Sequence, residues 1–184
     1  MAVTSAVDLY RQASAHASTI MAGVCAEHLI GPTPCAKWTV QDLVDHLVGG
    51  TGYLLSAATG NQPVPPAGPA TTGQFAVGFA AVLDAVARPG AMDRRCMSPL
   101  GFEWTVAEAL AGTFMDVLIH SWDLASATGQ GARLDPDLVQ ACWDMFVPVM
   151  PDRGREAGLI GPAVAVPVEA PLQDRLLGVM GREP

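Results

Sequence analysis

Positive charge is scarce in this sequence and gathers nowhere along it. Ten Lys and Arg residues stand against 18 Asp and Glu residues, which gives a formal net charge of −8, and the isoelectric point is near 4.7. Proteins that bind nucleic acid or anionic membranes usually present clustered basic side chains. We therefore expect neither nucleic acid nor a membrane as a partner.

Long apolar runs and closely spaced cysteines are also missing. No stretch reaches the 18 uninterrupted apolar residues of a membrane span, and Asp8 and Arg11 come before any apolar run that could form a secretory signal. The cysteines are Cys25, Cys35, Cys96 and Cys142. Their wide separation fits neither a zinc knuckle nor a disulfide-rich secreted domain. These absences predict a soluble, cytoplasmic protein with reduced thiols.

Aromatic residues make up only 6% of the chain, although hydrophobic residues make up 50%. Such a balance, together with plentiful alanine, suits closely packed helices better than sheets. A chain of 184 residues is long enough to bury one continuous core. We predict a single all-α domain over residues 1–184. The mean hydropathy of +0.30 adds an indication of exposed apolar area, and hence of a homodimer.

Helical periodicity and helix-breaking residues divide the chain into segments. The expected helices cover residues 4–29, 39–59, 74–87, 104–129, 135–150 and 171–181. A proline-rich stretch from Gly60 to Gly73 is too long for a simple turn and predicts a crossover. We expect an irregular connection over residues 88–103 and a short extended piece at AVAVPVEAP. Four long helices with one long crossover, followed by short C-terminal helices, indicate a four-helix bundle.

The second and fourth helices begin with matching capping signals. Thr39 and Asp42 form a capping box, in which each side chain accepts a hydrogen bond from a free backbone N–H group. Trp38, just before this cap, is placed to pack on the first helical turn as a hydrophobic staple. Thr105 and Glu108 repeat the capping box at the fourth helix. We interpret the match as shared capping chemistry rather than as an internal duplication.

Three side chains have the chemistry and the spacing of metal ligands. Asp116 and His120 are four residues apart, which places them on one helical face about 6 Å from each other. His46 on the second helix is a third ligand, and three protein ligands leave a position open for water or substrate. Asp116 lies about 17 Å from the start of its helix and His46 about 18 Å from the end of its own. Antiparallel packing of the two helices would place Asp116 and His46 at the same height along the bundle axis.

Each of these residues also has an ordinary explanation. An Asp and a His four apart are more often a surface pair, and a lone histidine is more often a partly buried residue with a local hydrogen bond. His16 and His28 receive this second interpretation. Asp42 and Asp123 lie within one turn of a proposed ligand, where they could orient an imidazole. Capping explains Asp42. For Asp123, a fourth metal ligand or a base is the alternative, and we favour a structural hydrogen bond.

The segments WTVQDLVDHL, MDVLIHSWDLASATGQ and DRLLGVMGR, with the proline-rich crossover, resemble the actinobacterial branch of the DinB-like superfamily over nearly the whole chain. That branch includes the metal-binding N-terminal domain of mycothiol-dependent maleylpyruvate isomerase. The resemblance implies an up-down-down-up four-helix bundle. It also implies a divalent metal held by a His on the second helix and by an acid and a His four residues apart on a later helix. The matching positions are His46, Asp116 and His120.

The resemblance further implies a function. The metal would be Zn²⁺, with Ni²⁺ or another divalent ion as alternatives, and it would activate a low-molecular-weight thiol such as mycothiol for attack on a small-molecule electrophile. A thiol-dependent transferase or isomerase is therefore expected, with no further catalytic side chain assigned. The isomerase has Glu in place of Asp116 and carries a further C-terminal domain, for which this chain has little room. Maleylpyruvate is accordingly not the expected substrate.

Two other functions stay open. A non-catalytic metal-binding or stress-linked protein would be favoured by a closed coordination sphere without an accessible pocket. A metal-free helical interaction module would be favoured if the side chains of His46, Asp116 and His120 pointed apart. The arrangement of these three residues therefore decides between the alternatives.

Overall fold

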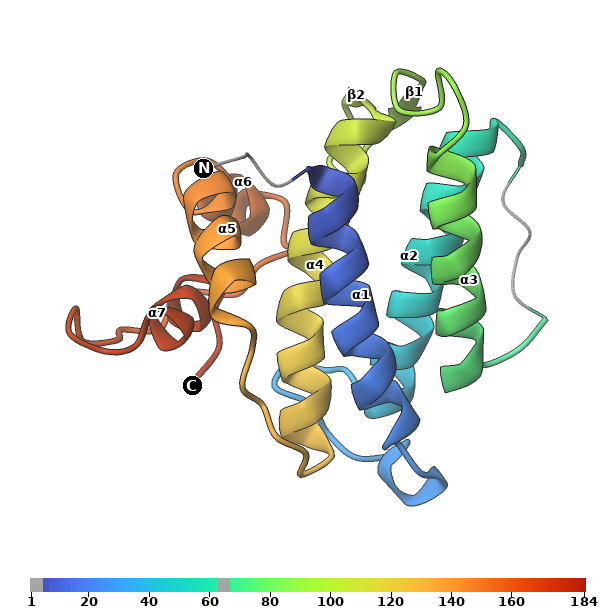
Figure 1. The fold of residues 1–184 in the computed structure, drawn as a ribbon. Coiled ribbons are helices and arrows are strands. Elements are labelled where there is room, and N and C mark those ends of the chain that lie inside the picture. Colours follow the sequence, from blue (N-terminus) through green and yellow to red (C-terminus); the bar gives the residue numbers. More distant parts are fainter. Residues whose placement is uncertain (1–4, 63–66) are drawn as a thin grey trace.

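Four long helices form the body of the protein in the computed structural model, which describes residues 5–62 and 67–184. They are α1 (Ala6–Ala22), α2 (Val40–Thr59), α3 (Thr72–Val86) and α4 (Val106–Ala127). Helices α1 and α4 run in one direction, whereas α2 and α3 run in the other (Figure 1). The expected all-α, up-down-down-up bundle is confirmed.

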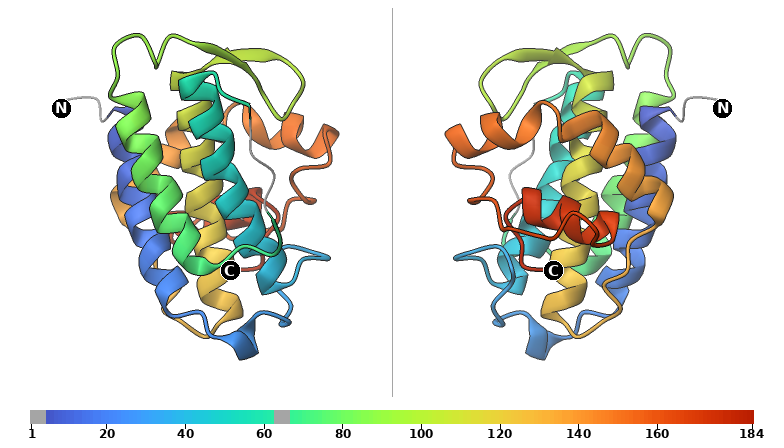
Figure 2. Two further views of the ribbon diagram at one scale, coloured as in Figure 1. Left: turned by 90° about the vertical axis from the view of Figure 1, so that its right-hand side faces the viewer. Right: turned by 90° about the vertical axis from the view of Figure 1, so that its left-hand side faces the viewer.

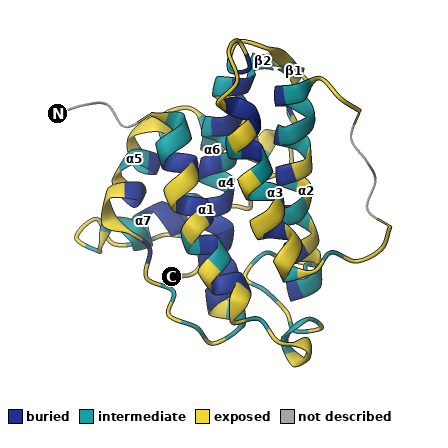
Figure 3. Cartoon of the chain, turned by 45° about the vertical axis from the view of Figure 1, so that its right-hand side comes forward, coloured by how far each residue is buried: buried dark blue, intermediate teal, exposed yellow. Residues whose placement is uncertain are grey.

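The bundle is closed around a single apolar core. Helix α1 packs against α3 and α4, and α2 packs against the same two helices from the opposite side. The inward faces of the four helices are buried, as Figure 3 shows. The fully buried side chains of this core include Leu43, Leu47, Leu54, Leu110, Phe114 and Leu118. Burying one such side chain contributes about 1.5–3 kcal/mol. No helix in the described part of the chain is long and apolar enough to span a bilayer.

Local capping fixes where α2 and α4 begin. The backbone N–H of Thr39 donates to Asp42 (2.8 Å), and the backbone N–H of Asp42 donates to the Thr39 hydroxyl (3.2 Å). Thr105 and Glu108 make the same pair of bonds at the start of α4, at 2.6 and 3.2 Å. Both predicted capping boxes are therefore confirmed. At its other end, α2 stops at Gly60, whose φ of 75° is a left-handed conformation that favours glycine.

The first helix is shorter than the expected 4–29. Helix α1 ends at Ala22, and a separate 3₁₀ turn covers Ala26–His28. This turn forms because the backbone N–H of Cys25 donates to Nδ1 of His28 (3.2 Å), which caps the turn locally in place of a continuous helix. Residue 4 of the expected helix, and residues 63–66 of the expected crossover, lie outside the described residues.

We expected an irregular connection over residues 88–103, but part of it forms a β-hairpin. Strands β1 (Arg95–Met97) and β2 (Glu103–Thr105) pair antiparallel, with Cys96 opposite Trp104. The hairpin lies at the end of the bundle where α4 begins (Figure 1). The indole N–H of Trp104 donates to the Tyr53 hydroxyl (2.7 Å), which ties the hairpin to α2. This long-range anchor has no signature in local sequence.

Three shorter helices follow the bundle: α5 (Pro136–Phe146), α6 (Met150–Glu156) and α7 (Leu172–Val179). The expected helix over 135–150 ends early because Pro148 has no N–H group and disfavours helical conformation in the residue before it. Helix α5 packs against α1, α4 and α7. Together the three helices cover one side of the bundle next to α4, as the right-hand view of Figure 2 shows.

Candidate metal centre

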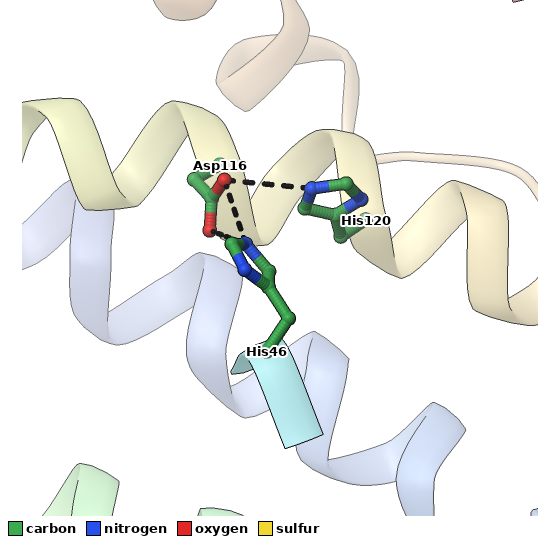
Figure 4. Close-up of side chains that lie close together, drawn as sticks. All are labelled: His46, Asp116 and His120. Atoms are coloured by element: carbon green, nitrogen blue, oxygen red, sulfur yellow. Dashed lines mark hydrogen bonds and ion pairs between the residues drawn. The ribbon is translucent and has the colours of Figure 1, made fainter. Parts of the chain in front are cut away.

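Antiparallel packing of α2 on α4 brings the three proposed ligands together. His46 comes from the first half of α2, and Asp116 and His120 come from successive turns in the middle of α4. One nitrogen or oxygen atom from each residue lies within 4.8 Å of the other two. Figure 4 shows the Asp116 carboxylate facing both imidazole rings, with an interaction to each. The side chains therefore converge, which removes the structural argument for a metal-free interaction module.

The distances within this cluster suit a metal ion. Nε2 of His46 lies 2.9 Å from Oδ2 of Asp116, and Nε2 of His120 lies 3.5 Å from Oδ1 of Asp116. Donor atoms around a tetrahedral zinc ion, with bonds of about 2.0–2.1 Å, are separated by about 3.4 Å. Two imidazoles and a carboxylate are also a donor set that catalytic zinc sites use. The donor types and their spacing therefore fit a divalent cation.

Trp38 packs on both imidazoles of the cluster. Its ring centroid lies 4.9 Å from that of His46 and 5.6 Å from that of His120, and it is nearly parallel to the His120 ring, at 21°. The two imidazoles in turn meet edge to face, at 4.8 Å and 75°. Sequence reasoning gave Trp38 only the role of a staple at the start of α2. In the structure the indole restricts rotation of both histidine rings.

Asp123 holds the other side of the His120 ring. Nδ1 of His120 donates to Oδ2 of Asp123 at 2.7 Å, and Asp123 is 0% exposed. The favoured structural hydrogen bond of Asp123 is thus present, and its partner is a proposed metal ligand. Because Nδ1 carries this proton, Nε2 is the nitrogen that faces Asp116. Asp42, the other acid considered for such a role, bonds Thr39 at the start of α2.

The position of Asp123 corrects one expectation. Helical periodicity places Asp123 on the side of α4 opposite the core residues Leu110 and Phe114, yet Asp123 is 0% exposed. Arg182 contributes to this burial and binds Asp123 through Nε (3.1 Å) and Nη2 (2.8 Å). Sequence reasoning missed Arg182, because only the docking of α7 and the residues after it brings the arginine to α4.

Opposite charges set the protonation states of the cluster. Burial lowers the pKa of His120, but the charge of Asp116 and hydrogen bonds from Asp116 and Asp123 outweigh it and raise the pKa to about 9. Burial likewise raises the pKa of Asp116, but the two histidines outweigh it and hold the pKa well below its usual value. The protonated ring of His120 and the carboxylate of Asp116 therefore stabilise each other.

A small cavity of about 50 Å³ opens beside the proposed ligands. Its walls are formed by Met115, Asp116, Ile119, His120, Leu159, Ile160, Met180 and Arg182. The donor atoms of α4 thus border a small, partly open space with both apolar and charged walls, which is large enough for a few water molecules or a small chemical group. A larger hollow of about 500 Å³ lies between α5 and α7 and includes none of the three proposed ligands.

Comparison with known proteins finds one matching family and two listed relatives. Residues 10–125 match the family model described as the mycothiol maleylpyruvate isomerase N-terminal domain. Two uncharacterized proteins of Mycobacterium tuberculosis, one from strain CDC 1551 / Oshkosh and one from strain ATCC 25618 / H37Rv, are each 40% identical over 124 residues. Each match covers 66% of this chain and 66% of the relative, just under two thirds of its length. No solved structure matches the chain significantly.

Proposed function

Because the chain belongs to the mycothiol maleylpyruvate isomerase N-terminal domain family, we propose that it is a metal-dependent protein acting in thiol-dependent transfer or isomerisation. The observation that carries this proposal is the convergence of His46, Asp116 and His120, whose donor atoms lie within 4.8 Å of one another. We propose these three residues as the metal ligands. The family match includes all three positions.

Zinc is the metal that we propose for this site. Two imidazoles and one carboxylate suit Zn²⁺, and Ni²⁺ or another divalent ion is compatible with the same donors. When bound, such an ion supplies a Lewis acid that lowers the pKa of a coordinated thiol and so favours the nucleophilic thiolate near neutral pH.

The protein's own residues prepare the site for that chemistry. Asp123 accepts a hydrogen bond from Nδ1–H of His120 (2.7 Å), which keeps Nε2 turned toward Asp116. Trp38 limits rotation of both imidazole rings. The apolar side chains of Ile119 and Leu159 line the adjoining cavity. A low-molecular-weight thiol, with mycothiol suggested by the family, and a small electrophile are the proposed substrates.

A second function is favoured by the size of the cavity. A space of about 50 Å³ is too small to enclose both a thiol cofactor and an electrophile, since ligand pockets usually measure about 300–1,000 Å³. A non-catalytic metal-binding or stress-linked protein needs no such space. In that case the same three residues would hold the ion for stability or for sensing.

Metal content tests the site directly. Elemental analysis of the protein purified without added metal should give about one divalent ion per chain, and His46→Ala or His120→Ala should lose most of it, because each change removes one of three ligands. His28→Ala is the matched control, since His28 caps a distant 3₁₀ turn and should leave the metal content unchanged. A parent protein without metal, or unchanged occupancy in both ligand variants, would contradict the proposal.

A conjugation assay then separates the two functions. Zinc-loaded protein should accelerate the reaction of mycothiol with an electrophile such as chlorodinitrobenzene, and His120→Ala should abolish the acceleration. Fully loaded protein that accelerates no reaction with mycothiol, or with other small thiols, across several electrophiles would favour the non-catalytic function.

A further inference from the structure

Arg182, near the C-terminus, makes a two-pronged contact with a buried acid on α4. Its Nε donates to Oδ1 of Asp123 at 3.1 Å, and its Nη2 donates to Oδ2 at 2.8 Å. Its remaining nitrogen, Nη1, donates to the carbonyl oxygen of Met180 at 2.7 Å. The arginine is only 8% exposed and the aspartate 0%. Such paired, shielded hydrogen bonds are among the stronger ones in proteins.

The same aspartate contacts a proposed metal ligand. Oδ2 of Asp123 accepts a hydrogen bond from Arg182 and a second one from Nδ1–H of His120, at 2.7 Å. Three side chains therefore form one continuous chain of hydrogen bonds, from the C-terminal segment through α4 to the candidate metal centre. The arginine lies 59 positions after the aspartate in the sequence, and it lies outside residues 10–125, which match the family model.

We propose that Arg182 is a positioning residue for the metal centre, acting through Asp123 on His120; this rests on the proposed metal-binding function. A carboxylate held by one hydrogen bond can turn about its side-chain bonds. The two guanidinium contacts fix the plane of the Asp123 carboxylate, so that Oδ2 stays aligned with Nδ1 of His120. Nε2 of the imidazole is then directed toward Asp116 before any ion binds, and outer partners of this kind tune metal affinity.

The local backbone holds the arginine in place. The backbone N–H of Arg182 donates to the carbonyl of Leu177 (2.9 Å), and that of Gly181 donates to Gly178 (3.0 Å), so the chain turns back on the end of α7. Gly181 has a φ of +81°, and a Cβ at this position would lie 3.1 Å from the backbone of Gly161. Only glycine fits this turn without strain. The turn therefore fixes the backbone position of Arg182.

Charge compensation is the competing role. A buried carboxylate requires a cationic or hydrogen-bonding partner, and Arg182 could satisfy Asp123 without any effect on His120. Arg182→Lys separates the two roles, because an ammonium keeps the charge but cannot donate to both oxygens in the fixed geometry of a guanidinium. Arg155→Met is the matched control. Arg155 also ties the C-terminal region together, through bonds to Val179 (3.0 Å) and Asp152 (2.9 Å).

The experiment has two readouts on each variant, after circular dichroism has shown that it is folded. Zinc affinity is measured by competition with a chelator, and the Nδ1 proton of His120 is followed by ¹H–¹⁵N NMR in metal-free protein. In Arg182→Met we expect zinc to bind about 10–100-fold more weakly and the Nδ1 proton to exchange faster with water. Arg182→Lys should recover only part of both losses, and Arg155→Met should match the parent.

Parent-like zinc affinity and proton exchange in Arg182→Met would overturn the proposal. Full recovery of both readouts in Arg182→Lys would assign the arginine to charge compensation and overturn it as well. If Arg182→Met does not fold, the partial loss in Arg182→Lys against none in Arg155→Met decides the question. A parent that binds no zinc would contradict the proposed function alone, because the metal-free NMR readout still shows whether Arg182 orders the His120 ring.

Discussion

Nε2 of His46 lies 2.9 Å from Oδ2 of Asp116, although 70 positions separate the two residues in the sequence. This hydrogen bond joins α2 to α4, one helical turn before His120 on α4 (Figure 4). Since the donor atoms of the three proposed ligands face one another, we expect a metal ion to bind with little movement of the backbone. A preorganised site loses less conformational entropy on binding than a flexible one.

Replacing Asp116 with Asn should weaken zinc binding by at least about tenfold, the lower bound for loss of an outer partner of a metal site. The amide keeps the shape of the side chain but removes its negative charge and leaves a poorer ligand. Competition with a chelator measures the change. Asp42→Asn is the control, because Asp42 bonds only within the capping box of α2. Equal zinc affinity in Asp116→Asn and the parent would count against Asp116 as a ligand.

Without metal, the protein should become less stable as the pH rises toward alkaline values. Burial lowers the pKa of His120, but Asp116 and Asp123 outweigh it and raise the pKa to about 9, above the value of about 6.5 for an unfolded chain. The protonated ring therefore stabilises the folded state fully below about pH 6.5, and this contribution is lost as the pH rises through about 9. Urea unfolding with EDTA present, between these two pH values, measures the free energy of unfolding.

The control for this pH dependence is the variant His120→Gln, which has no titrating ring at the centre and should show a smaller loss of stability over the same range. An identical pH slope in His120→Gln would show that another group is responsible.

Trp38 should report metal binding by its fluorescence. Its indole stacks on the imidazoles of His46 and His120, at 4.9 and 5.6 Å between centroids. A Co²⁺ ion held by those imidazoles would quench the nearby indole, so titration with Co²⁺ should lower the emission of the parent. Trp38→Phe should remove the largest part of this response, while Trp104→Phe, altered in the hairpin, should keep it. Equal fractional quenching in Trp38→Phe and the parent would contradict the arrangement.

Helix capping should affect stability without affecting the metal centre. Thr105→Ala removes the hydroxyl that accepts from the backbone N–H of Glu108 (3.2 Å), and it should lower the free energy of unfolding by about 1 kcal/mol. Zinc affinity should stay unchanged, because Asp116 lies about 16 Å further along α4. Urea unfolding and chelator competition measure the two effects. Thr19→Ala, at an exposed hydroxyl within α1, should not lower stability; a comparable loss there would contradict the capping argument.

The features that sequence predicted well are local ones. Thr39 with Asp42 and Thr105 with Glu108 form capping boxes within four residues, and such pairs depend on little else. Asp116 and His120 share a helical face for the same reason, since their spacing alone sets their geometry. The pairing of α2 with α4 required more, namely the direction of each helix in the bundle, which the family resemblance supplied.

The features that sequence missed depend on long-range packing. Asp123 looks like a flank residue on α4, and only the turn at Gly181 buries it and brings Arg182 against it. Trp38 precedes a helix start, where a staple is the ordinary interpretation, yet the packing of α2 on α4 places it over two histidine rings. The β1–β2 hairpin likewise depends on the hydrogen bond from Trp104 to Tyr53. None of these contacts leaves a periodic signal in the chain.

The most direct test of the metal centre is anomalous diffraction at the zinc absorption edge from crystals of zinc-loaded protein. We predict one peak per chain between α2 and α4, at about 2.0–2.2 Å from Nε2 of His46, Nε2 of His120 and a carboxylate oxygen of Asp116. The absence of a peak among these three side chains, or a strong peak elsewhere with these side chains free of metal, would contradict the account.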